Sequence, residues 1–133
     1  MTAEQRNRSL LWASIALLAA VVLHDLDHVR QGRSVEPLVV AIGVVGDIAV
    51  ITMVALAIRG SRWGPHAAVV IGFGNVLGFI AVHVIPDWGP LADGYPGIGV
   101  DGLSWAIVYI PMAAALWLGV TGLSALRSPR QAV

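Results

Sequence analysis

Two groups of histidine and aspartate in this chain have a spacing that suits metal binding or proton transfer. Residues 24–28 place two histidines and two aspartates within five positions, directly after a long apolar run. On a helix, residues three and four positions apart share a face. His24, Asp27 and His28 should therefore form one stripe along a helix, whereas Asp25 should point elsewhere. A charged cluster at the end of a membrane-length apolar segment costs free energy to place, which indicates that the cluster has a function.

His83 and Asp87 form a second pair with the same four-residue spacing. If the two segments are helices that end at the same face, the two groups converge into three imidazoles and two carboxylates. Such sites suit zinc, non-haem iron and manganese, and imidazole also suits copper. We therefore predict a site for one of these divalent transition metals, with the ligands His24, His28, His83, Asp27 and Asp87. The alternatives are a buried hydrogen-bonded or proton-handling cluster, and residues that only mark a membrane boundary.

Asp47 is a further candidate, because it lies about 11 residues into an apolar segment and hence near the middle of a bilayer. A carboxylate at that depth should face inward. Asn75 reaches a similar depth and is a plausible hydrogen-bond partner. The pair is either a polar clamp between helices or a second-shell or proton-relay element below the histidines. The motif Gly74-x-x-x-Gly78 predicts close contact between the helices that carry Asp47 and Asn75, or a dimer face.

The composition indicates that lipid is the main solvent of this chain. Hydrophobic residues make up 57% of it and charged residues 12%, whereas a soluble domain carries about 25% charged residues. The formal net charge is zero, which argues against nucleic acid as a partner. The sequence contains neither cysteine nor lysine, which excludes thiolate metal sites and Schiff-base cofactors.

Four apolar segments each reach the roughly 20 residues that span a bilayer core. We predict one all-α membrane domain over residues 1–133, a bundle of four transmembrane helices at roughly 9–30, 37–58, 66–85 and 102–126. A cleavable signal peptide is the competing interpretation of the first segment, but no convincing cleavage site precedes the acidic cluster. A 16-residue loop, residues 86–101, joins the third and fourth segments.

The arginines predict the orientation of this bundle. Six of the eight fall on the side of both termini, which the positive-inside rule places in the cytoplasm. The histidine-rich stretch is then on the outer face of a plasma or inner membrane.

Three classes of function fit these features. The leading one is a small polytopic membrane protein with an outward-facing metal site, in a binding or accessory role or as a metal-dependent enzyme. The second is an electron-transfer subunit with haem b held between histidines of the first and third helices. The third is a structural or assembly subunit, or a proton-coupled transporter that uses Asp47. The expected partners are the lipid bilayer and, for so small a chain, a second copy or a larger membrane complex.

Overall fold

The computed structural model describes residues 2–86 and 88–127, and these residues form helices and connecting loops without a strand. The prediction of an all-α protein is thus confirmed for this part of the chain. The elements are α1 (Ala3–Gln31), α2 (Pro37–Ile58), α3 (Gly64–Phe79), the π-helical turn η1 (Ile80–Val84), α4 (Tyr95–Ile98) and α5 (Gly102–Arg127).

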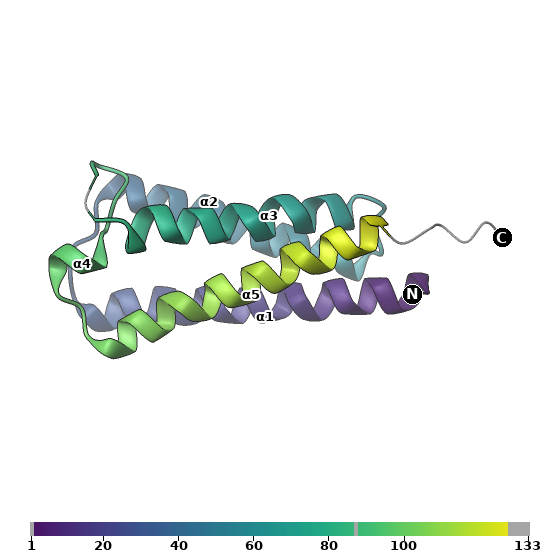
Figure 1. The fold of residues 1–133 in the computed structure, drawn as a ribbon, viewed down its shortest axis with the longest axis horizontal. Coiled ribbons are helices and arrows are strands. Elements are labelled where there is room, and N and C mark those ends of the chain that lie inside the picture. The colour runs from purple at the N-terminus through teal and green to yellow at the C-terminus, as the bar shows by residue number, and fades with distance from the viewer. Residues whose placement is uncertain (1, 87, 128–133) are drawn as a thin grey trace.

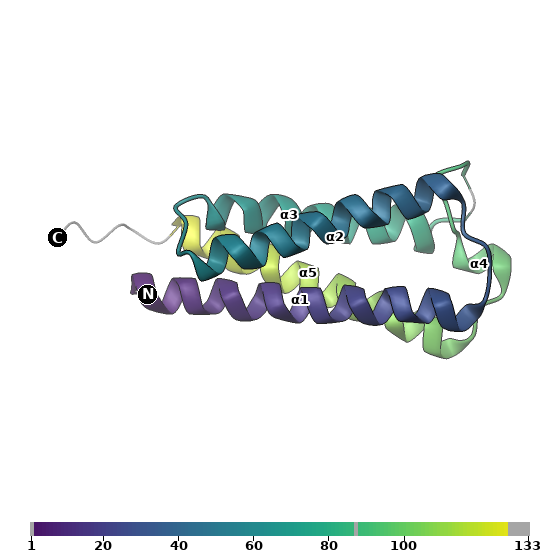
Figure 2. The same cartoon turned by 180° about the vertical axis from the view of Figure 1, so that it is seen from behind.

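Four helical stretches are long and apolar enough to cross a membrane, which points to a membrane protein. They comprise 28, 22, 21 and 26 residues, and the third of them joins α3 to η1. The long helices lie side by side (Figures 1 and 2). The start of α1 and the end of α5 lie at one end of the bundle, which we call the terminal end. The opposite end, which we call the α4 end, holds α4, the end of α1 and η1.

The first helix begins six residues earlier than the apolar pattern predicts. Thr2 accepts a hydrogen bond from the backbone N–H of Gln5, whose side chain accepts one from the Thr2 N–H. This capping box satisfies two N–H groups at the helix start, so the polar residues before Ser9 are helical too. At the other end, Gly32 stops α1 with the left-handed φ of 63° that glycine adopts without strain.

The core of the bundle lies in the half nearer the terminal end. Its largest buried side chains include Leu10, Leu17, Met53 and Leu118, all at most 1% exposed. In this half α3 and α5 approach so closely that a Cβ atom on Gly72 would lie 2.7 Å from the Ala115 carbonyl oxygen. The prediction that Gly74 and Gly78 bring α2 and α3 into close contact is wrong, because a Cβ atom at either position would meet nothing within 4 Å. The alternative, a dimer face, stays a prediction.

Candidate metal centre

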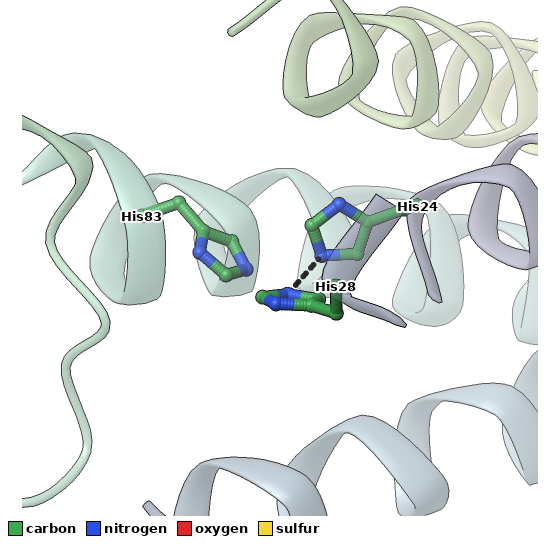
Figure 3. Close-up of side chains that lie close together, drawn as sticks. All are labelled: His24, His28 and His83. Carbon is green, nitrogen blue, oxygen red and sulfur yellow. Dashed lines mark hydrogen bonds between the residues drawn. The ribbon is translucent and has the colours of Figure 1, made fainter. Parts of the chain in front are cut away.

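Three histidines come together at the α4 end of the bundle. His24 and His28 lie one turn apart on α1, and His83 faces them from η1 (Figure 3). Their candidate ligand atoms all lie within 4.8 Å of one another, and the Nε2 atoms of His24 and His28 are 3.1 Å apart. His24 and His83 are only 6% and 5% exposed. The structure therefore brings the three histidines of the predicted site together.

His83 is presented by a π-helical turn rather than by a regular helix. The Ile85 N–H donates to the carbonyl oxygen of Ile80 at 3.0 Å, which is the five-residue spacing of a π turn. Such turns occur mostly as single insertions within α-helices and are frequent at functional sites. The backbone of Ile85 is already extended, so helical spacing no longer relates His83 to the residues after it. The predicted ligand Asp87 lies outside the described residues.

Each histidine of the cluster also has a polar atom without a partner. The Nδ1 atoms of His24, His28 and His83 are buried, and none forms a hydrogen bond within residues 2–86 and 88–127. An unsatisfied buried polar group costs about 1–3 kcal/mol. Three such nitrogens therefore lie together in one small volume.

Asp93 is the residue that the sequence did not single out. Its Oδ2 atom lies 3.8 Å from the Nδ1 atom of His83 and 4.0 Å from that of His28. Its side chain is only 9% exposed, and its backbone N–H donates to the carbonyl oxygen of Val82 at 2.8 Å. These distances are too long for hydrogen bonds, but a small ring movement would close them. A loop acid 10 residues from His83 gives no periodic signal that could have revealed it.

Arg33 holds this carboxylate in place. Its Nη1 and Nη2 atoms donate to the two oxygens of Asp93 at 3.1 and 2.9 Å, which is a bidentate pair of fixed geometry. These hydrogen bonds raise the pKa of Arg33. Arg33 also donates through Nε to the side-chain oxygen of Gln31 at 2.9 Å, so the loop is tied to the end of α1.

Asp27 belongs to a different cluster from the histidines. Its side chain is fully buried, and its two oxygens accept hydrogen bonds from Arg30 at 2.6 Å and from Gln31 at 2.8 Å. Both partners also reach Ser104 on α5, with distances of 2.8 and 3.1 Å to its hydroxyl oxygen. Among the described residues Asp27 thus anchors α1 to α5 instead of joining the three imidazoles.

The same anchor extends to the loop and to α4. Arg30 donates to both carboxylate oxygens of Asp101 at 2.9 and 3.0 Å. These bonds, with the backbone N–H of Ser104, lower the pKa of Asp101 to about 2. The Gln31 amide lies 3.2 Å from the hydroxyl of Tyr95, whose burial raises its pKa. The Tyr95 ring packs on His83 with 4.9 Å between centroids, which connects the anchor to the histidine cluster.

Asp47 and Asn75 line the same cleft, and no hydrogen bond joins them within the described part of the chain. Both line a space of about 650 Å³ between α1, α2 and α3, together with the three histidines. The Asn75 amide donates to the carbonyl oxygen of Ile71 on its own helix at 2.8 Å. Asp47 has no hydrogen bond within the described part of the chain. Asp25 lines the same cleft, so it does not point away from the site as the helical spacing predicts.

The arrangement of the imidazoles suits the coordination of one metal ion. Two nitrogens bound to the same ion at about 2.1 Å lie no more than about 4.2 Å apart. The 3.1 Å between His24 and His28 already meets this limit. Rotation of the His83 ring would bring the third nitrogen within it, because all three candidate ligand atoms lie within 4.8 Å. Three protein ligands leave a coordination position open for water or another ligand.

The fold and this cluster together define a small helical protein with four membrane-length helices and a group of three largely buried histidines at one end. Comparisons of the chain with protein-family models, with curated proteins and with solved structures gave no match.

Proposed function

We propose that this membrane protein binds one divalent transition metal ion through His24, His28 and His83. The observation that carries the proposal is the meeting, within 4.8 Å, of two buried imidazoles and one half-buried imidazole, each with a buried and unpartnered Nδ1 atom. A cluster that served only packing would satisfy these nitrogens with neighbouring side chains. Here Asp93 is close enough to accept a hydrogen bond from Nδ1 once a metal fixes the rings. Carboxylate–histidine–metal arrangements of this kind orient the ligands and raise their basicity.

The donor set favours zinc, copper or iron over manganese. Three neutral imidazoles are intermediate donors, whereas manganese prefers oxygen ligands. The carboxylate beside the cluster, that of Asp93, lies 3.8 and 4.0 Å from the Nδ1 atoms of His83 and His28, but both of its oxygens already accept hydrogen bonds from Arg33. The open coordination position allows a binding role as well as a metal-dependent reaction.

A haem between α1 and α3 fits this geometry less well. The rings of His24 and His83 are in a T-shaped contact with 4.8 Å between their centroids. Two axial ligands of a haem lie on opposite faces of a wide macrocycle, and rings packed edge to face leave no room for it. A single ion of small radius is the better match.

The arginine distribution supports an orientation with both termini in the cytoplasm and the metal site near the outer face. Six of the eight arginines belong to the terminal end in sequence. At the α4 end, Arg30 and Arg33 are instead paired with acidic side chains. The positive-inside rule then places the terminal end in the cytoplasm of a plasma or inner membrane.

Metal analysis of the purified protein tests the proposal. We expect an equimolar transition metal in the wild type after loading and desalting, and its loss in His24→Ala and His83→Ala. His66→Ala is the matched control, because this fourth histidine is exposed at the start of α3 and should not affect binding. Asp93→Asn should keep the metal with an affinity about 10–100-fold lower, as for other outer partners of metal-bound histidine.

The proposal fails if the wild type binds no metal under these conditions, or if His24→Ala and His83→Ala bind as much as His66→Ala does. A Soret band in the purified wild type would instead support the haem alternative. Thermal unfolding of each variant shows whether loss of metal reflects loss of the fold.

A further inference from the structure

A cleft beside the histidines is large enough to hold a small molecule next to the proposed metal ion. It has a volume of about 650 Å³ and is bounded by α1, α2 and α3. His24, His28 and His83 line it, so the open position of a metal bound to them can face this space. A volume of this size lies within the range of about 300–1,000 Å³ that is typical of small-molecule sites.

Glycines keep this space open. Gly43 and Gly46 on α2 and Gly74 and Gly78 on α3 all line the cleft. A Cβ atom at any of the four would meet no other atom within 4 Å. These glycines therefore do not serve close helix contact, and larger side chains at these positions would project into free volume.

The lining also specifies the polarity of the occupant. Of the 22 lining residues, 16 are glycine or apolar. The polar ones are the three histidines, Asp25, Asp47 and Asn75. No arginine lines the cleft in the described part of the chain, and the acidic side chains of Asp25 and Asp47 line it, so the walls of the cleft disfavour an anionic head group. An apolar body with an uncharged polar head matches this lining best.

The shape of the cleft favours a chain over a compact molecule. On α2 the lining residues run from Val39 to Ala49, which corresponds to about 15 Å along the helix axis. The histidines are at the α4 end of this run, and Asp47 and Asn75 lie nearer its other end. Because α2 and α3 are membrane-length helices, an apolar chain can enter the cleft from the lipid.

We propose that the cleft binds a single-chain lipid with an uncharged oxygen-containing head, such as a long-chain alcohol, whose oxygen occupies the open position on the metal. This inference rests on the proposed metal site and names the class of its ligand. The apolar tail lies along the glycine-lined walls of α2 and α3.

Spectroscopy of the protein loaded with Co²⁺ in lipid nanodiscs tests this. The visible bands of Co²⁺ respond to a change in its ligands, so 1-dodecanol should shift them, whereas dodecane, which lacks the oxygen, should not. Gly43→Leu and Gly78→Leu, one on each wall, should keep the Co²⁺ spectrum and weaken the response to 1-dodecanol at least about tenfold. Gly102→Leu is the control, because this glycine also has open space around it but does not line the cleft.

The outcomes separate the two proposals. If the wild type binds no Co²⁺, the metal site itself is refuted. If Co²⁺ binds but 1-dodecanol leaves its bands unchanged, or if dodecane shifts them equally, the lipid ligand is refuted and the metal site stands. An undiminished response in both leucine variants would also overturn the inference. If either leucine variant loses Co²⁺ because it misfolds, Gly43→Ala and Gly78→Ala provide a smaller obstruction, and a graded loss of the response is then expected.

Discussion

The two halves of the bundle use glycine in opposite ways. Toward the terminal end, Gly72 and Gly122 on α3 and α5 allow backbone contact, and a Cβ atom on Gly122 would lie 2.8 Å from the Pro65 carbonyl oxygen. Toward the α4 end, Gly43 and Gly78 are next to open space. The same residue type thus produces tight packing in one half and a cleft in the other. A glycine motif in a membrane helix therefore does not by itself indicate helix contact.

Polar side chains divide the molecule in the same way. The main hydrophobic core cluster lies mostly in the terminal half, whereas the ion pairs of Arg30 and Arg33 lie at the α4 end. The two halves therefore have different roles. Close packing in the terminal half stabilises the bundle, and the α4 end holds the candidate site. At the α4 end, polar contacts hold the helices together, as apolar packing does at the terminal end.

The largest test of this division compares two aspartates on the same helix. Asp27→Ala should reduce the free energy of unfolding by about 2–3 kcal/mol, because it removes the fully buried carboxylate that accepts charge-assisted hydrogen bonds from Arg30 and Gln31. Asp25→Ala should have little effect, since Asp25 is exposed and its side chain has no hydrogen bond within the described residues. Unfolding of both variants in one detergent measures the difference.

Equal stability of the Asp27→Ala and Asp25→Ala variants would contradict the anchoring role of Asp27. If Asp27→Ala lost metal while its stability was unchanged, Asp27 would instead return to the ligand set that the sequence predicts.

A second test compares two glycines on α3. Gly72→Ala should destabilise the protein by about 2 kcal/mol, because the new methyl group would lie 2.7 Å from the Cα atom of Gly119 and α5 would have to move. Gly74→Ala, two residues further on, should be neutral or slightly stabilising, since alanine favours the helix and the space is free. Thermal unfolding under identical conditions gives the comparison, and a larger loss for Gly74→Ala would refute the assignment of tight and open faces.

The sequence was sufficient to predict the four long helices and the proximity of the histidines. Apolar length determines a membrane-length helix, and the spacing of His24 and His28 gives their common face. It was not sufficient for Asp93, because no periodicity relates a loop residue to a helix. The π turn before Ile85 gives no periodic signal in the sequence either. Asp27 shares a helical stripe with the histidines, yet its tertiary partner Ser104, 77 positions later, determines its role.

The smallest expected effect concerns Asp101, at the solvent-exposed edge of the α4 end. Its pKa of about 2 is below the ordinary value of 3.8, mainly because Arg30 donates hydrogen bonds to its carboxylate. The unfolded state therefore binds a proton at higher pH than the folded state does, and this contribution to stability is complete above pH 3.8 and is lost as the pH falls through about 2. Asp101→Asn should lower the unfolding temperature of the metal-free protein slightly at neutral pH, and the difference should vanish near the acid limit. Because the pair is exposed, salt should also reduce the difference. A difference that is constant over the whole pH range would show that the neutral hydrogen bonds of Asp101, and not its charge, hold the loop to α1.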